Sequence, residues 1–153
     1  GDLLYHGPRN DLPKEYAPKE VIRLLNERKN QIYAVRGNCE AEVDQMVLDF
    51  PVMADYCVIL ADGKAIYATH GHIYNENNLP PLSEGDVLIH GHTHVLKAER
   101  REGYTLLNPG SVSIPKEGSL RGYMTLEGTL FRWCDLAGTE YHRAALEDLT
   151  PWP

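Results

Sequence analysis

The sequence lacks the cysteine framework of a small secreted protein. It has three cysteines, an odd number, and they lie far apart at positions 39, 57 and 134. No CxxC pair occurs, so neither a disulfide scaffold nor a structural zinc site built from thiolates is indicated. Because disulfides are rare in reducing compartments, free and scattered cysteines lead us to expect a cytoplasmic protein.

Long hydrophobic runs and an excess of basic charge are also missing. The fully apolar stretches span only a few residues, so no membrane span is expected, and no basic segment followed by an apolar one indicates a signal peptide. With 22 acidic and 15 basic side chains, the net charge is −7. A protein that binds nucleic acid regardless of sequence needs a basic face, so a nucleic-acid partner is not expected.

What is present is an ordinary globular composition. The 153 residues are 42% hydrophobic and 24% charged, which predicts one folded domain over residues 1–153. The first part predicts helices that alternate with a strand. Helical spacing of apolar residues covers residues 18–29 and 41–50, and residues 31–35 read as a short buried strand.

The rest of the sequence is rich in predicted strands. Residues 56–60 and 65–69 flank an Asp-Gly pair, which is typical of a β-hairpin. Further strands are expected at residues 87–89, 104–107, 122–127, 129–135 and 139–145, the last three as an antiparallel meander, followed by a loose end at 149–153. The pattern therefore predicts an α/β protein.

Histidine is the unusual residue of this sequence. There are seven, and four of them lie in Thr69-His70-Gly71-His72 and Gly91-His92-Thr93-His94. Imidazole is a common ligand of Mn, Fe, Co, Ni and Zn. Each cluster alone also fits two surface histidines in a turn, but two such clusters together favour a metal site. His70 follows the predicted strand directly and is the better-placed ligand, whereas His72 is a candidate to face a pocket.

Two further polar residues become candidate metal ligands when they are considered together with these histidines. Asn38 follows Gly37 in ordinary turn chemistry, but its side chain can also offer a carbonyl oxygen to a metal. Asp2 would by itself be a solvated acid, yet a carboxylate can bridge two cations. In α/β sheets ligands bind at the carboxyl ends of strands. Asn38, the two histidine clusters and, by analogy, Asp2 are all expected at such ends and could therefore meet.

In chain order, Gly1-Asp2, Gly37-Asn38-Cys39-Glu40 and the two histidine clusters resemble the calcineurin-like metallophosphoesterases, and most closely their small bacterial YfcE-type phosphodiesterase branch. The resemblance runs through most of the chain and includes residues 6–10, 35–39 and 108–116. It implies a β-sandwich flanked by helices and a metal-dependent hydrolase that acts on a small phosphodiester substrate.

The resemblance also implies a centre of two divalent ions, typically manganese, with Fe, Co, Ni or Zn as alternatives. Asp2 would bridge both ions, Asn38, His70 and His92 would complete the ligands of one, and His94 would bind the other. The family's first motif, Asp-x-His on an opening strand, does not occur near the start of this sequence. We therefore expect a strand–helix unit of about 30 residues to be missing, and activity to be impaired.

The general acid of the implied reaction is left open. In many relatives a histidine follows the asparagine and assists the leaving group, but here that position is Cys39, as in the YfcE-type branch. A thiol with a pKa of about 8.5 is a poor substitute for imidazole at neutral pH. His6, Arg9 and His72 are the alternatives. Arg9 could also grip a phosphate through its guanidinium group, or be a plain loop cation, and Cys39 could be a small buried thiol.

A second hypothesis comes from a different class of protein. The same fold can lose catalysis and serve as a protein-interaction scaffold, in which case His70→Ala and His92→Ala would leave function unchanged. The retained cluster of ligands argues against it. Single-metal binding without chemistry is a third alternative. The physiological substrate and the oligomeric state, a homo-oligomer included, are not determined by the motifs.

Overall fold

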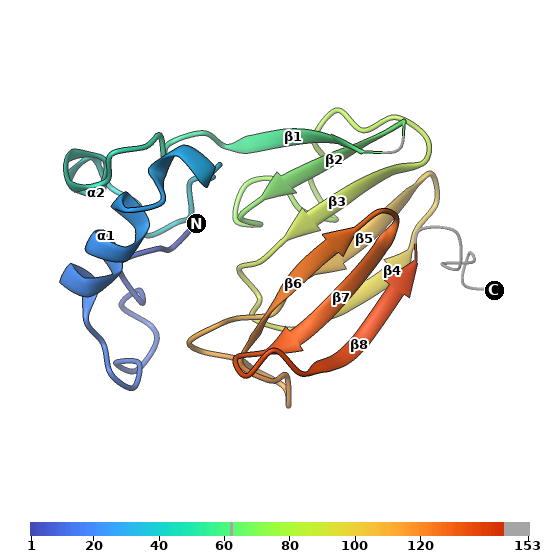
Figure 1. The fold of residues 1–153 in the computed structure, drawn as a ribbon. Coiled ribbons are helices and arrows are strands. Elements are labelled where there is room, and N and C mark those ends of the chain that lie inside the picture. Colours follow the sequence, from blue (N-terminus) through green and yellow to red (C-terminus); the bar gives the residue numbers. More distant parts are fainter. Residues whose placement is uncertain (62, 146–153) are drawn as a thin grey trace.

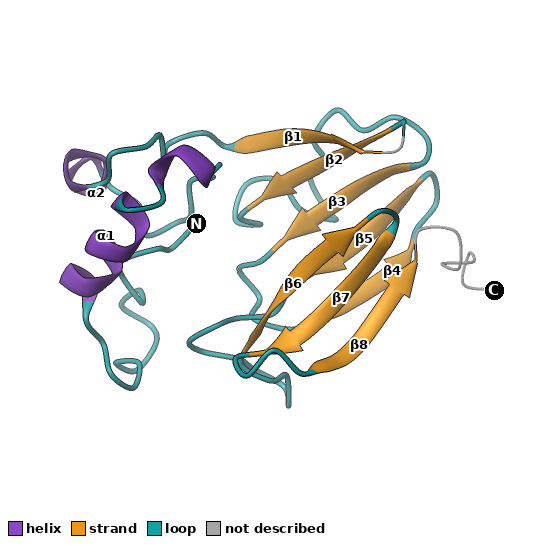
Figure 2. Cartoon of the chain, viewed as in Figure 1, coloured by secondary structure: helices purple, strands orange, loops and turns teal. Residues whose placement is uncertain are grey.

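A computed structural model describes residues 1–61 and 63–145 of the chain. Figure 1 shows a smaller N-terminal part that carries the helices, next to a larger part built from strands. The N-terminal part contains α1 (Pro18–Asn26), a short 3₁₀ helix (Lys29–Gln31) and α2 (Glu42–Val47). As Figure 2 shows, the loops of this part approach the strand-rich part from one side.

Eight strands form two sheets. They are β1 (Tyr56–Ala61), β2 (Lys64–Thr69), β3 (Asp86–His90), β4 (Lys97–Arg100), β5 (Tyr104–Asn108), β6 (Gly122–Glu127), β7 (Leu130–Asp135) and β8 (Glu140–Ala145). The first sheet has the order β1-β2-β3-β5-β4, with β2, β3 and β5 parallel and an antiparallel strand at each edge. The second sheet is the antiparallel meander β6-β7-β8.

The two sheets pack face to face through alternate side chains of their strands. Ile66 and Val87 of the first sheet meet Phe131 and Trp133 of the second in one buried cluster. The neighbouring residue Leu88 points the other way and packs in a separate cluster with residues of β5. This alternation is the period of two that a strand imposes. The result is a β-sandwich whose first sheet also buries Leu88, Tyr104 and Leu106 on its outer face.

A third hydrophobic cluster holds the N-terminal part together. Its buried members are Leu4, Leu48, Phe50 and Val52, and the apolar side of α1 packs against them. Leu4 belongs to the segment that begins the chain, so the apolar residues of α1 fix that segment's position. This matters because the same segment carries Asp2.

Most of the expected strands are confirmed, because they follow from local patterns. The hairpin of β1 and β2, the strands β3 and β5, and the meander β6-β7-β8 lie where they were expected. The α/β sandwich with flanking helices is confirmed as well. The turn residue Asp62 and the expected loose end at 149–153 lie outside the described residues. That residues 1–153 form one domain stays a prediction.

Three expectations need correction. The helices are shorter than expected, since α1 ends at Asn26 and α2 covers only Glu42–Val47. The strand expected at residues 31–35 does not form. The segment is extended and partly buried. The N–H groups of Gln31 and Ile32 close the turn before it, on the carbonyls of Arg28 and Lys29, and Arg36, just after it, donates to the carbonyl of Ala54 (2.7 Å). None of these bonds pairs the segment with a strand of the described structure. The strand β4, with the charged sequence Lys-Ala-Glu-Arg, was not predicted.

Within the described ranges, neither helix is long and apolar enough to cross a membrane.

Candidate metal centre

The two histidine clusters lie side by side because they follow neighbouring parallel strands. His70 comes directly after β2, and His92 comes two residues after the end of β3. Thr69 and His90 are opposite each other at the ends of these strands. The N–H of Gly91 then donates to the carbonyl of His70 (2.9 Å), which ties the two turns together. The carboxyl ends of the strands therefore bring both turns to one edge of the sheet, as expected.

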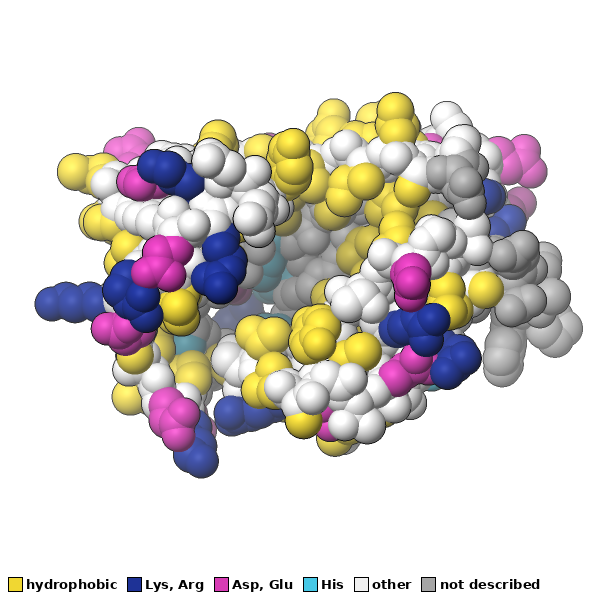
Figure 3. All heavy atoms as spheres, in the orientation of Figure 1, with side chains coloured by type: hydrophobic (Ala, Val, Ile, Leu, Met, Phe, Trp, Pro, Cys, Tyr) yellow, Lys and Arg dark blue, Asp and Glu magenta, His cyan; other side chains and the backbone are white. Residues whose placement is uncertain are grey.

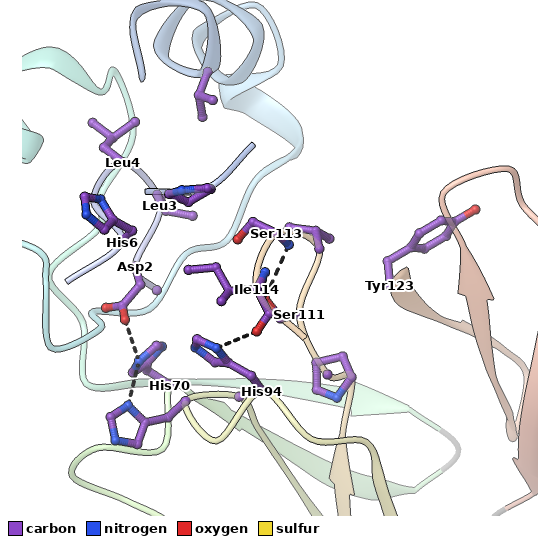
Figure 4. A pocket seen from close by; sticks show the side chains of 18 of the residues that line it. Asp2, Leu3, Leu4, His6, His70, His94, Ser111, Ser113, Ile114 and Tyr123 are labelled. Carbon is purple, nitrogen blue, oxygen red and sulfur yellow. Dashed lines mark hydrogen bonds and ion pairs between the residues drawn. The ribbon is translucent and has the colours of Figure 1, made fainter. Parts of the chain in front are cut away.

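The Nε2 atom of His70 is the point where the candidate ligands meet. It lies 3.3 Å from Asp2 Oδ2, 3.2 Å from Asn38 Oδ1 and 3.3 Å from His92 Nδ1. His70 itself is buried, with 6% of its surface exposed. Figure 4 shows Asp2 and His70 pointing toward one another. The structure thus brings together all four residues that were expected to hold the first ion.

The chemistry of this donor set fits a divalent metal ion. Bonds of about 2.0–2.2 Å to imidazole nitrogen and carboxylate oxygen place neighbouring ligand atoms roughly 3.0–3.5 Å apart, and the three distances fall in this range. Two imidazole nitrogens, a carboxylate and an amide oxygen all present lone pairs, which repel each other unless a cation or a proton lies among them. Borderline first-row ions accept such a mixture.

The coordination shell itself is not complete. Among the described residues, no three His, Cys, Asp or Glu side chains surround a single point in a way that would hold an ion. The cluster therefore supplies suitable donors in close proximity, and small side-chain adjustments would have to accompany binding.

Backbone strain is concentrated at the candidate ligands. Asp2 (φ 57°), His92 (φ 63°) and His94 (φ 63°) occupy the left-handed region, which residues other than glycine rarely adopt. Such strained residues cluster at functional sites, where the surrounding structure holds them in place. The left-handed conformation at His92 and His94 turns the chain tightly enough for both side chains to serve one edge of the sheet.

Glu40 holds the segment that carries Asp2. Its two carboxylate oxygens accept the N–H groups of Asp2 and Leu3, each at 2.7 Å, and that of Gly37 as well. A side chain at Gly37 would collide with the Asp2 carboxylate, so this close approach needs glycine. The sequence motifs assigned no role of its own to Glu40. Its position directly after the Gly-Asn-Cys turn is the signal that could have identified it.

Asp2 is charged at neutral pH. Burial raises the pKa of its carboxyl group, but the hydrogen bonds from His70 and from the N–H of Cys39 (2.9 Å) outweigh this and bring the pKa to about 2. A carboxylate in this state is an acceptor only and is available to a cation.

His94 is prepared as a ligand in a different way. Its Nδ1 donates to the carbonyl of Ile114 at 2.8 Å, so Nε2 carries the lone pair. Figure 4 shows His94 beside the loop that contains Ser111 and Ile114. Burial lowers the pKa of His94; the Ile114 bond opposes this, and the positive charge of Lys116 adds to it. Burial also lowers the pKa of His92. Neutral imidazole is the form that binds metals.

Two cavities adjoin the cluster. The polar one has a volume of about 420 Å³, and its lining includes Asp2, Asn38, Cys39, His92, His94 and residues 6–10. The larger one, about 710 Å³, lies between the segment around α1, the loop after β5 and the start of β6. Figure 3 shows histidine side chains inside a hollow at this place, and Figure 4 shows Tyr123 on the far side of the larger cavity.

The candidate catalytic side chains differ in their access to these cavities. His6 lines both, and its Nδ1 is buried without a hydrogen-bond partner in the described part of the chain. Arg9 lines the polar cavity. His72 lines neither cavity, and its ring packs edge-on against that of His70 at a centroid distance of 5.4 Å.

Cys39 lines the polar cavity as a neutral thiol. Burial, and then the negative charge of Asp2, raise the pKa of its thiol to about 11. The side-chain amide of Asn38 approaches its sulfur at 3.3 Å. The raised pKa disfavours the thiolate, which is the reactive form of a cysteine. The structure also adds Lys116 to this cavity, a residue to which the sequence motifs assigned no role.

Comparisons with known proteins identify the family of this chain. The family profile of the calcineurin-like phosphoesterase superfamily domain matches residues 11–129. The phosphodiesterase YfcE of Escherichia coli K12 is 50% identical over 127 residues, which cover 83% of this chain and 69% of YfcE. The probable metallophosphoesterase YsnB of Bacillus subtilis is 30% identical over 126 residues, which cover 75% of this chain and 67% of YsnB.

The fold agrees as well. A solved structure of Yfce, described as a phosphoesterase from E. coli, superimposes with a TM-score of 0.90 at 43% identity. The superposition covers 95% of this chain and 80% of that one.

Proposed function

Because the chain belongs to the calcineurin-like phosphoesterase superfamily, we propose that it is a metal-dependent hydrolase of phosphodiesters. The observation that carries the proposal is the meeting of Asp2, Asn38 and His92 at the Nε2 atom of His70. The relative named phosphodiesterase supports the diester as substrate.

In this proposal the centre would take two divalent ions, with manganese preferred. Asn38, His70 and His92 would hold one ion and His94 the other, and the carboxylate of Asp2 would serve as a ligand to both. Such ions, when bound, lower the pKa of water and withdraw charge from phosphoryl oxygens. Of the ligands that the resemblance implies, Asp2 and His94 would be available to the second ion, so we expect weak turnover.

The remaining groups of the polar cavity act on the substrate. Arg9 binds a phosphate oxygen through its guanidinium group. His6 is a better candidate than His72 for giving a proton to the leaving oxygen, since His6 lines both cavities and His72 lines neither. Cys39 stays protonated at neutral pH, and a neutral thiol in place of an imidazole acid favours esters with good leaving groups.

We further propose a cytoplasmic setting, a small phosphodiester as the partner, and no nucleic-acid or membrane partner. Free thiols at Cys39, Cys57 and Cys134 support a reducing compartment. A homo-oligomer is compatible with all of this.

The test is hydrolysis of bis(p-nitrophenyl) phosphate with added Mn²⁺, together with the metal content by elemental analysis. His70→Ala and His92→Ala should each lower turnover at least about 100-fold and reduce bound metal, since loss of even an outer residue of a metal site costs 10–100-fold. His142→Ala is the matched control, because His142 is an exposed histidine on β8. Equal turnover by all four proteins would contradict the proposal and favour a scaffold.

A further inference from the structure

We propose that Lys116 is an anion-binding residue of the polar cavity and holds the phosphate of the substrate together with Arg9; the substrate in this statement rests on the proposed function. The two side chains come from different segments, the loop after β5 and the loop before α1, and line the same cavity of about 420 Å³. The candidate metal ligands Asp2, Asn38, His92 and His94 line it too.

Neither cation is neutralised by a carboxylate. In the described ranges, no ion pair involves Arg9 or Lys116, whereas Lys97 and Arg36, for example, pair with Glu76 and Asp55. A chain with a net charge of −7 repels anions as a whole. Two cations at one cavity that form no ion pair would make the electrostatic potential there more positive than over the rest of the protein. This would raise the local concentration of an anionic substrate.

The backbone of Lys116 is attached directly to the candidate metal centre. Its N–H donates to the carbonyl of His94 at 3.0 Å, and its own carbonyl accepts the N–H of Ser119 at 2.9 Å. Between them, Glu117 (φ 51°) and Gly118 (φ 78°) both have left-handed backbones. The hydroxyl oxygen of Ser119 in turn accepts the N–H of Leu96 at 3.1 Å. Lys116 therefore begins a tight turn that is held against the His94 loop from both ends.

The strained residue of this turn supports a functional role. Glu117 adopts a conformation that costs a residue other than glycine about 1 kcal/mol or more. The left-handed conformation of Glu117 allows the tight turn, and the turn fixes the direction in which the Lys116 side chain leaves the backbone. Lys116 is itself exposed, so this turn, and not burial, restricts the position of its backbone.

Arg9 is placed in a comparable way. The turn that carries it closes with the N–H of Asn10 on the carbonyl of Gly7 (3.5 Å), and the side-chain amide of Asn10 donates to the carbonyl of His6 (2.7 Å). Gly7 has a left-handed backbone (φ 79°). In both turns the main chain is therefore restricted next to the cationic residue, Arg9 in one and Lys116 in the other. Arg9 supplies a planar fork and Lys116 a compact charge, which are the two usual ways to bind a phosphate.

The first experiment measures the binding of inorganic phosphate by isothermal titration calorimetry, in buffer with and without Mg²⁺. Lys116→Gln should weaken binding about fivefold, which corresponds to one solvent-accessible ion pair. Lys116→Arg should stay within about twofold of the wild type. Lys19→Gln is the matched control, because Lys19 is exposed on α1 and lines neither cavity. Phosphate affinity that is equal in Lys116→Gln and Lys19→Gln, or undetectable in the wild type, overturns the inference.

The second experiment separates this inference from the proposed function. With bis(p-nitrophenyl) phosphate and Mn²⁺, Lys116→Gln should raise KM about fivefold and leave kcat within about twofold, because the ammonium binds ground state and transition state alike. An unchanged KM in an active protein overturns the role of Lys116 and leaves the hydrolase intact. A chain without turnover in which Lys116→Gln still weakens phosphate binding overturns the hydrolase and retains the anion site.

Discussion

The Glu40 carboxylate shows how a residue that faces no cavity can control the site. It accepts three N–H groups, from Asp2, Leu3 and Gly37, and so clamps two segments far apart in the chain. The negative charge at Asp2 and the amide oxygen of Asn38 reach His70 only when these segments are held together. Replacing a residue that orients a metal ligand commonly lowers the metal affinity about 10–100-fold.

Glu40→Gln should therefore weaken Mn²⁺ binding about tenfold. The amide is nearly the same size but loses the charge that strengthens these hydrogen bonds, and one of its two groups is a donor that cannot accept an N–H. Calorimetric titration with Mn²⁺ measures the affinity. Glu42→Gln, an exposed change in the first turn of α2, is the control. Equal affinity in the two variants, with unchanged circular dichroism, would argue against a positioning role.

At the scale of elements, an acidic residue ties the loop after β2 to two strands. Glu76 lies in that loop, and its carboxylate contacts His90 Nε2 at the end of β3 (2.9 Å) and Lys97 Nζ at the start of β4 (2.7 Å). His90 is fully buried, with 1% of its surface exposed. The loop begins at His70, so these contacts hold a segment that starts at a candidate metal ligand against β3 and β4.

This network makes stability depend on pH. Burial raises the pKa of Glu76, but the hydrogen bond from Lys97, then that from the backbone of Glu76, and then the electrostatic contribution of His90 outweigh it, and the pKa falls from 4.5 to about 2. A lowered pKa in the folded state means that the stabilisation is present above pH 4.5 and is lost as the pH falls toward 2. We expect a loss of about 1–2 kcal/mol in the free energy of unfolding, after allowance for solvent screening.

The measurement is urea unfolding between pH 2 and pH 6, with Glu76→Gln as the comparison. The wild type should lose stability more steeply than the variant below pH 4.5, and Glu20→Gln, in an exposed ion pair on α1, should follow the wild type. Parallel curves for wild type and Glu76→Gln would rule out this contribution.

The elements that the sequence predicted well are those whose partners are close in the chain. The β1–β2 hairpin needs only alternation and a turn, and the meander repeats the same pattern twice. The segment at 31–35 has an apolar strand pattern but no strand beside it, and β4 is a charged edge strand that owes its existence to β5. Strand formation at these two places depends on distant residues, which a local pattern does not contain.

At the scale of the whole molecule, two hydrophobic clusters stabilise different parts. One lies between the sheets around Phe131 and Trp133, and the other lies around Leu48 and Phe50 in the N-terminal part. The candidate centre lies where the parts meet, since Asp2 and Asn38 come from one part and the histidines from the other. Its integrity therefore requires that both clusters fold together.

Leu48→Ala tests whether residues 1–153 behave as one domain. Removing this buried side chain should lower the free energy of unfolding by about 2–4 kcal/mol. If the chain is a single cooperative unit, the unfolding midpoint measured by Trp133 fluorescence should shift as much as the midpoint measured by far-UV circular dichroism. The chain has two tryptophans, so Trp152→Phe serves as the common background. A Trp133 transition that does not move would show that the two parts unfold separately.

The sequence by itself determined the chemistry of this protein: two imidazole clusters, an amide and a carboxylate in a family-specific order, and the strands whose ends carry the histidines. Only the tertiary structure decided which of these groups meet. It joined Asp2, Asn38, His70 and His92 at one atom, and it added Glu40 and Lys116. The physical reason is that residue type and spacing define donors and local turns, whereas contacts between distant segments arise from the packing of the two clusters and the register of parallel strands.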